Sequence, residues 1–231
     1  MTKPSNYICQ WDAILNLEQL CSRGAAMGES HFIIGVDLDG VVADFYSYMR
    51  KVAAEWTGKD IDTLPTGVSW GLPEWGIGGE YASLHHFAVT QRELFSRVDP
   101  MPGAALTLRE FSKMEDVRIR IITHRLLIPN FHKMAVEQTV GWLDYHGIPY
   151  SDLCFMQEKG AVGADVYLED GPENIKKLSE EDKRVIIFSN STNIRITDPP
   201  AGRAQNWTAA KTLLMNEYRE YKSRIRGQEL Q

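Results

Sequence analysis

Cysteine is scarce in this chain, and long apolar runs are missing. Its 231 residues include three cysteines, Cys9, Cys21 and Cys154, with no Cys-x-x-Cys pair and no cysteine–histidine spacing typical of zinc. We therefore expect reduced, partly buried thiols in a cytoplasmic protein rather than a disulfide framework. No stretch of roughly 18 apolar residues occurs, and the N-terminus lacks a basic region followed by an apolar segment. We expect neither secretion nor a membrane partner.

A basic excess is missing as well. The 25 Lys and Arg residues and 31 Asp and Glu residues leave a net charge of −6. Such a chain has no surplus of positive charge to displace counterions, so we do not expect a nucleic-acid polymer as its main ligand. Small anionic substrates stay open, because one bound metal ion can reverse the local field. The length allows one α/β domain with a modest insertion.

Short apolar segments alternate with helical patterns after residue 30. We expect strands at 31–36, 117–123, 153–155, 166–168 and 185–188, and helices at 44–56, 81–95, 105–113, 131–146, 172–178 and 207–226. This alternation predicts an α/β fold built on a doubly wound parallel sheet.

Residues 46–97 separate the first predicted strand from the next core element, and residues 59–79 are rich in Gly, Pro and Trp. A structureless loop of that length is rare in a compact domain, so the segment predicts a small, mainly helical cap inserted after the first strand. The core would then consist of residues 31–45 and 98–231. We expect residues 1–30 to form a helical leader that packs on the core or lies between subunits, which leaves a homodimer open.

Two aspartates follow the first predicted strand, in the pattern Asp37-x-Asp39-Gly40. Ligands bind at the carboxyl end of an open α/β sheet, and neighbouring carboxylates repel unless a cation offsets them. Asp37 can attack phosphorus, and Asp39 can protonate the leaving oxygen and later deprotonate water. A calcium loop is excluded, because its register would place Gly35 and Tyr46 where acidic ligands are required. A solvated turn is the structural alternative.

Three further groups lie near predicted strand ends. The Thr123 hydroxyl can hold a phosphoryl oxygen, although a Thr there also caps helices. Lys159 offers a compact positive charge for phosphate, although most lysines are simply exposed. In Glu169-Asp170 we predict Asp170 as a metal ligand and Glu169 as a supporting or water-mediated one; an acidic helix cap is the alternative.

A divalent cation is a condition of this chemistry. A carboxylate and one phosphate charge at ~4 Å repel by roughly 4 kcal/mol at an effective dielectric near 20, so the attack needs compensating charge. We expect Mg²⁺ to be bound by Asp37, the carbonyl of Asp39, Asp170 and waters, in the octahedral geometry that this ion prefers.

These four groups, in this order, resemble the motifs of the haloacid dehalogenase-like (HAD) superfamily in its phosphatase form, which has a Rossmann-like core. The 5'(3')-deoxyribonucleotidase family is similar along 37–45, 93–104, 158–165 and 168–170. This resemblance implies Mg²⁺-dependent release of phosphate from nucleoside monophosphates through an aspartyl-phosphate. It also implies that Phe45 stacks on the base and sugar together with cap aromatics, for which Trp70 and Trp75 are the candidates. Burial in the core of the cap is the alternative for both tryptophans.

The chain departs from that family at two motifs. The second motif reads Thr123-His124-Arg125 where the family usually has Thr-Ser-Pro, and the fourth reads Glu169-Asp170-Gly171-Pro172 where Asp-Asp-Arg-Pro is usual. We predict that His124 binds phosphate, and Arg125 either does so or signals a different substrate.

Four other interpretations concern the cap and the function. The cap histidines His85 and His86 could reach substrate, but no metal spacing supports them, and exposure is the default expectation. A phosphatase for a sugar or another small phosphate and a non-catalytic metal- or phosphate-binding protein are the open alternatives. A carbon–halogen hydrolase is disfavoured by Asp39, because halide needs no proton.

Overall fold

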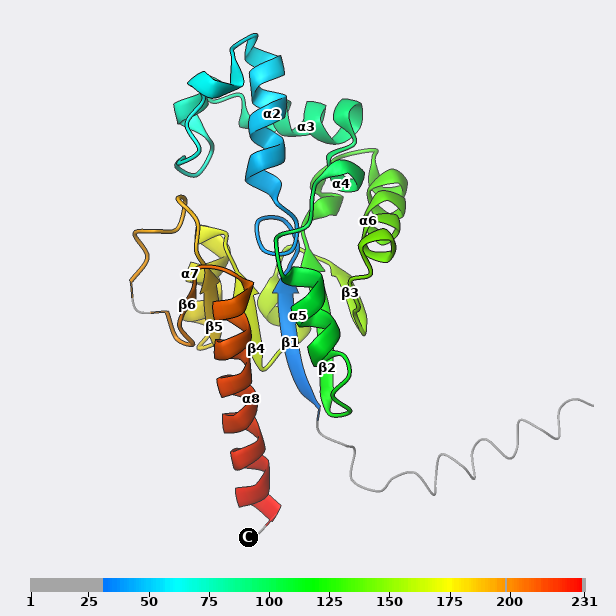
Figure 1. The fold of residues 1–231 in the computed structure, drawn as a ribbon, viewed down its shortest axis with the longest axis vertical. Helices are drawn as coiled ribbons and strands as arrows, with labels where there is room; N and C mark the ends of the chain where they lie inside the picture. Colours follow the sequence, from blue (N-terminus) through cyan, green and yellow to red (C-terminus); the bar gives the residue numbers. More distant parts are fainter. Residues whose placement is uncertain (1–30, 198, 230–231) are drawn as a thin grey trace, which may run out of the picture. The chain divides into compact units, whose positions relative to one another are not determined.

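A parallel sheet of six strands forms the centre of the computed structural model, which describes residues 31–197 and 199–229 (Figure 1). The predicted leader at 1–30 lies outside the described residues. The strands are β1 (Phe32–Asp37), β2 (Val117–Thr123), β3 (Asp152–Phe155), β4 (Val166–Glu169), β5 (Val185–Phe188) and β6 (Arg203–Ala204). Their order is β3-β2-β1-β4-β5-β6, and every neighbouring pair is parallel. The predicted α/β fold is confirmed.

Helices connect the strands and cover both faces of the sheet. They are α2 (Phe45–Thr57), α3 (Tyr81–Arg92), α4 (Leu94–Arg97), α5 (Ala104–Phe111), α6 (His132–His146), α7 (Pro172–Glu180) and α8 (Trp207–Glu229). Single 3₁₀ turns occur at η1 (Ile61–Thr63), η2 (Pro73–Trp75), η3 (Arg125–Leu127) and η4 (Lys159–Val162). Over the residues that the structure describes, no helix has the length and apolarity to cross a bilayer.

Neighbouring residues of the central strands belong to two separate hydrophobic clusters, one on each face of the sheet. The sequences of these strands are therefore continuously apolar. Ile121 belongs to the cluster on the side of α5 and α8, whereas Ile122 belongs to the cluster that contains Ile175 and Leu178 of α7. Successive side chains of a strand point to opposite faces, so a sheet buried on both sides needs apolar residues at every position.

The register of the strands brings several chain segments to one edge of the sheet. Val36 of β1 pairs with Ile121 of β2 and with Leu168 of β4. Therefore Asp37, Thr123 and Glu169, which end these strands, lie side by side at the carboxyl edge. This edge is where the candidate site forms.

Two elements differ from the sequence-based expectation. The helix expected at 81–95 is interrupted at Glu93, whose φ of 51° is left-handed and whose N–H bonds to the carbonyl of Ala88, so the chain turns before α4. The edge strand β6 was not expected, since two residues carry no detectable period.

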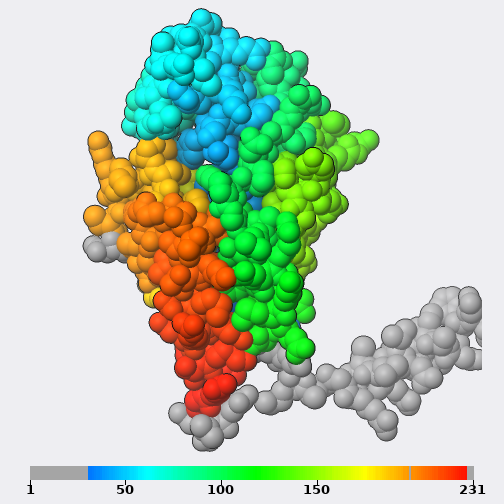
Figure 2. Space-filling model, in the orientation of Figure 1, coloured from blue at the N-terminus to red at the C-terminus, as the bar shows by residue number. Residues whose placement is uncertain are grey.

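Residues 46–97 lie beyond the carboxyl edge of the sheet, where α2 and α3 stand above the strands in Figure 1. Figure 2 shows α2 and the 59–79 segment, in blue and cyan, gathered at that end. The segment has buried apolar side chains of its own, namely Leu64, Val68, Leu72, Trp75 and Ile77. The contacts nevertheless join residues 31–231 into one unit, so the division into core and cap stays a prediction.

Candidate active site

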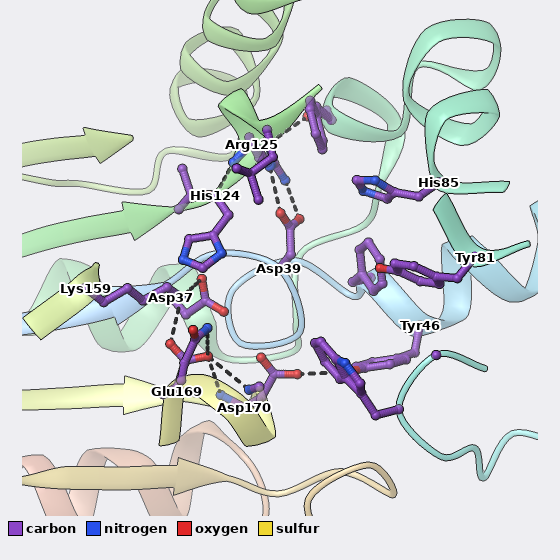
Figure 3. Close-up of a pocket in the computed structure, with 18 of the residues that line it drawn as sticks. Asp37, Asp39, Tyr46, Tyr81, His85, His124, Arg125, Lys159, Glu169 and Asp170 are labelled. Carbon is purple, nitrogen blue, oxygen red and sulfur yellow. Dashed lines mark hydrogen bonds and ion pairs between the residues drawn. The ribbon is translucent and has the colours of Figure 1, made fainter. Parts of the chain in front are cut away.

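A cavity of about 270 Å³ lies between the carboxyl edge of the sheet and helices α2 and α3 (Figure 3). Its lining includes every residue predicted for the site except Trp75: Asp37, Asp39, Phe45, Trp70, Thr123, His124, Lys159, Glu169 and Asp170. Residues more than a hundred positions apart in the chain therefore share one pocket.

Three carboxylates meet at the bottom of this pocket. One oxygen from each of Asp37, Glu169 and Asp170 lies within 4.8 Å of the other two. The Nζ of Lys159 lies 2.6 Å from Oδ1 of Asp37 and 2.6 Å from Oε2 of Glu169. All four residues are at most 9% exposed, so these charges interact with little screening by water.

The pKa shifts show how unevenly the charges are balanced. Burial, followed by the charge of Glu169, raises the pKa of Asp37 well above its usual range and that of Asp170 to about 7. Burial opposes the charged form of Lys159, but Asp37 and Glu169 outweigh it and raise the Lys159 pKa. Burial also opposes the ionised form of Glu169, but Lys159 lowers the Glu169 pKa. One lysine thus faces three carboxylates, and a divalent cation fits the missing charge.

The hydrogen bonds separate the acids that can hold a cation from the one that supports them. Oε1 of Glu169 accepts hydrogen bonds from the backbone N–H groups of Asp170 (3.2 Å) and Gly171 (2.9 Å) and from Nδ2 of Asn174 (3.2 Å). Because Oε2 of Glu169 is paired with Lys159, both of its oxygens are engaged. These bonds favour Asp37 and Asp170 over Glu169 as ligands, and the metal site stays a prediction.

Gly40 allows the aspartate loop to approach Asp170 closely. A Cβ at this position would lie 2.2 Å from Oδ2 of Asp170, and the φ of Gly40 is +90°. The same Oδ2 accepts hydrogen bonds from Nδ2 of Asn190 (2.7 Å) and from the hydroxyl of Tyr46 (3.3 Å). The Asp170 carboxylate is thus oriented from both sides, and only glycine leaves room for it.

Asp39 has a different environment from Asp37. Its Oδ2 accepts a hydrogen bond from Nε of Arg125 at 3.0 Å, and its Oδ1 accepts one from Nη2 at 2.7 Å. In Figure 3 the Asp39 carboxylate points toward Arg125, away from the cluster of Asp37, Glu169 and Asp170. Arg125 was expected to contact phosphate or mark another substrate; instead it pairs with the second aspartate.

Thr123 and His124 line the pocket at the end of β2. Thr123 is 1% exposed, and its Oγ1 accepts a hydrogen bond from the N–H of Arg125 at 3.4 Å. The Nε2 of His124 donates to the carbonyl of Gln157 at 3.0 Å, since a carbonyl can only accept. Burial, followed by the charge of Lys159, lowers the pKa of His124 and favours a neutral ring.

The opposite wall of the pocket is mostly aromatic and comes from residues 45–95. Phe45 is 8% exposed, and Trp70 lies on the rim with 51% exposed. Trp75 does not line the pocket as predicted: it is 1% exposed, and its indole N–H donates to the carbonyl of Pro65 within the 46–97 segment. The alternative interpretation, a tryptophan buried among the residues of its own segment, describes Trp75.

Two polar groups in this wall differ from the sequence-based expectation: Tyr81 was missed, and His85 was expected to be exposed by default. Tyr81 and His85 lie four residues apart on α3, and their rings stack at 5.8 Å with an interplanar angle of 7°. His85 is half-buried in the pocket lining and not exposed as expected, whereas His86 is exposed. The i, i+4 spacing on a predicted helix was the available signal that the two rings share a face. Burial, followed by Asp39, raises the pKa of Tyr81 to about 12.

Comparison with known proteins points to one family. The family model described as 5' nucleotidase, deoxy (pyrimidine), cytosolic type C protein (NT5C) matches residues 31–219. A protein of Chlorobaculum tepidum with the name "Putative 5'(3')-deoxyribonucleotidase" is 55% identical over 188 residues, covering 80% of this chain and 91% of that protein.

Two solved structures share the fold at low sequence identity. A phosphonoacetaldehyde hydrolase-like protein from Oleispira antarctica aligns with a TM-score of 0.54 at 10% identity, covering 95% of this chain and 97% of its own. A haloacid dehalogenase-like hydrolase from Bacteroides fragilis aligns with a TM-score of 0.52 at 13% identity, covering 76% and 97%. At such low identity, these likenesses show a shared fold alone.

Proposed function

The chain belongs to the cytosolic type C family of deoxy (pyrimidine) 5' nucleotidases, which are phosphoric monoester hydrolases on a HAD-like fold, and we propose that it releases phosphate from deoxyribonucleoside monophosphates through an aspartyl-phosphate on Asp37. The observation that carries this proposal is the meeting of Asp37, Asp39, Thr123, Lys159 and Asp170 in one pocket at the carboxyl edge of the sheet.

In the first half-reaction an oxygen of Asp37 bonds to phosphorus, and the bond between phosphorus and the ester oxygen breaks. Asp39 gives a proton to the departing oxygen. In the second half-reaction Asp39 takes a proton from water, whose oxygen bonds to phosphorus as the bond to Asp37 breaks. In Figure 3 Asp37 lies beside Lys159, whereas the Asp39 carboxylate points toward Arg125, so attack and proton transfer are assigned to separate groups.

Cationic and polar groups hold the phosphate in this proposal. Lys159, 2.6 Å from Asp37, offsets the repulsion between this carboxylate and the phosphate. The Thr123 hydroxyl and the His124 ring line the same end of the pocket. Thr123 donates to a phosphoryl oxygen, and His124 binds phosphate through Nδ1 once the ring takes up a proton, because Nε2 is already bonded to the carbonyl of Gln157. Mg²⁺ held by Asp37, Asp170 and the carbonyl of Asp39 would supply the positive charge that three carboxylates and a dianion require.

The rest of the substrate lies against the aromatic wall. Phe45, Tyr81, Phe95 and Trp70 surround the part of the cavity beyond the acids, and flat rings suit a nucleobase. We assign residues 31–45 and 98–231 to the core and 46–97 to the cap, in a cytoplasmic enzyme. A sugar phosphate is the second candidate, favoured by the hydroxyl of Tyr81 and the ring nitrogens of His85 in this wall.

Phosphate release from a panel of deoxyribonucleotides, ribonucleotides and sugar phosphates tests the proposal, with Mg²⁺ and with EDTA. We expect turnover of nucleotides that EDTA abolishes and that Asp37→Asn reduces by at least a thousandfold. The control is Asp62→Asn, an exposed aspartate in the η1 turn, which should leave activity unchanged. Preference for sugar phosphates would favour the second candidate, and no release from any compound would favour a non-catalytic binding protein.

A further inference from the structure

Arg125 is a cation whose side chain is almost completely buried. Its side chain is 1% exposed, and its guanidinium carbon lies 4.4 Å from the centre of the Phe95 ring and 6.0 Å from that of Trp142. A guanidinium in such a place is oriented by its aromatic neighbours as well as by its hydrogen bonds.

Most of the hydrogen-bonding capacity of Arg125 is already used. Nε and Nη2 donate to the two oxygens of Asp39, while Nη1 donates to Oγ1 of Thr139 (3.1 Å) and to the carbonyl of Phe95 (3.4 Å). A guanidinium has five N–H groups, so these four bonds leave one. A role as the main phosphate ligand would require breaking this set, which is why we assign Arg125 to Asp39 and not to phosphate.

The bonds of Arg125 connect three separate segments with Asp39. Arg125 begins the η3 turn directly after β2, Thr139 lies on α6, and Phe95 lies on α4 at the end of the 46–97 segment. Within the described part of the chain, Arg125 supplies both hydrogen bonds to the Asp39 side chain. The direction of the Asp39 carboxylate therefore depends on Arg125.

We propose that Arg125 is a positioning residue that holds Asp39 at the place where the ester oxygen leaves and where water later attacks. This inference rests on the proposed function. When Asp39 has given its proton to the ester oxygen, the carboxylate that results is bound by Arg125 through both oxygens, as in the structure. The same carboxylate then takes the proton from the attacking water, so Arg125 orients the group through both half-reactions.

The test compares substrates that differ in their need for a proton on the leaving oxygen. Arg125→Gln should lower kcat at least tenfold for the best nucleotide, with KM within about threefold. Single-turnover release of p-nitrophenol from p-nitrophenyl phosphate should change less than threefold, because that leaving group departs as an anion. Arg125→Lys should recover part of the loss, since Lys keeps the charge but cannot bind two oxygens in a fixed plane.

A double-mutant comparison gives a second readout. If Arg125 acts through Asp39, Asp39→Asn combined with Arg125→Gln should be no slower than Asp39→Asn alone, within about twofold. The matched control is Arg184→Gln, which removes an ion pair with Glu217 of α8 at the opposite edge of the sheet and should leave both substrates unaffected. Thermal unfolding of each variant checks that it is folded.

Three results would overturn the role of Arg125: equal losses on both substrates, a raised KM as the main effect, or additive losses in the double variant. A wild-type protein without phosphatase activity would instead overturn the proposed function itself. The two failures are therefore distinct.

Discussion

At the scale of single residues, each aspartate of the Asp37-x-Asp39 pair has its own cation. Lys159 lies 2.6 Å from Asp37, and Arg125 lies 2.7 Å from Asp39. Asp37 is in addition surrounded by the carboxylates of Glu169 and Asp170, while Asp39 points away from them. Two identical side chains, two residues apart, thus receive environments suited to two tasks.

Substitution of Gly40 tests how closely the aspartate loop must approach Asp170. Gly40→Ala would place a Cβ 2.2 Å from Oδ2 of Asp170 at a φ of +90°. We expect loss of phosphate release by at least a hundredfold, because the Asp170 carboxylate must move. Gly58→Ala is the control: its φ of +64° also disfavours Ala, but nothing lies within 4 Å. We expect Gly58→Ala to cost about 1 kcal/mol of stability without loss of kcat; equal activity losses would contradict the explanation.

His85 provides a pH-dependent contribution to stability. Burial lowers the pKa of His85, opposed by Asp39 and assisted by Arg125 and His86. The folded state then binds fewer protons than the unfolded state, so stability is full above about pH 6.5 and falls as the pH drops, by at most about 1.4 kcal/mol per pH unit. In urea unfolding at pH 7.5, 6.5 and 5.5, His85→Gln should show a smaller fall than the wild type. The exposed His86→Gln should not, and identical slopes for all three proteins would refute the assignment.

At the scale of elements, one serine joins the loop that carries Trp70 to the loop after β5. The hydroxyl of Ser191 donates to the carbonyl of Val68 (2.7 Å) and accepts from its N–H (2.8 Å). Leu72, four residues after Val68 in the same loop, has a left-handed φ of 59°. This residue is 1% exposed and lines the pocket. The two hydrogen bonds between Ser191 and Val68 therefore fix this loop, and with it the rim of the pocket, to the loop after β5.

Removal of this hydroxyl should loosen the rim without touching the acids. For Ser191→Ala we expect KM for a nucleotide to rise about three- to tenfold with little change in kcat, since each hydrogen bond is worth about 1 kcal/mol. Limited proteolysis should cut the 59–79 segment faster. Ser69→Ala is the control, because in the described part of the chain the Ser69 hydroxyl bonds to Glu74 alone, within the same loop. An unchanged KM would show that the rim does not depend on Ser191.

At the scale of the molecule, the acidic pocket makes stability depend on a bound cation. Asp37, Glu169 and Asp170 repel one another in the folded state and separate on unfolding. Mg²⁺ at 100 times its Kd should add about 2.7 kcal/mol, which raises Tm by roughly 5–10 °C for a chain of this size. Thermal unfolding with EDTA or Mg²⁺ measures this, and Asp170→Asn should lose the shift while Asp62→Asn keeps it. A wild-type Tm insensitive to Mg²⁺ would contradict the predicted metal site.

Much of the fold was predictable because its signals are local. Among the residues that the structure describes, the five longer strands and the helices of eight or more residues were expected within a few residues of their bounds, since apolar periodicity and glycine stops act over neighbouring positions. The interruption of the helix at Glu93 was not expected, because Glu rarely adopts a left-handed φ and nothing in the sequence indicates that it does so here. The order of the strands in the sheet could not be predicted from local sequence patterns either, because it depends on which distant strands pair with one another.

The sequence by itself determined which residues end the strands, and so which acids and polar groups reach the carboxyl edge of the sheet. Only the tertiary structure decided which of them meet. Arg125 and Asp39 are 86 residues apart, and their pairing follows from the neighbouring positions of β1 and β2. Trp70 lies on the pocket rim and Trp75 in the interior of the 46–97 segment, and the sequence could not separate them because side-chain direction in an irregular loop has no period. Pairing and direction arise from packing between distant segments, which no local pattern encodes.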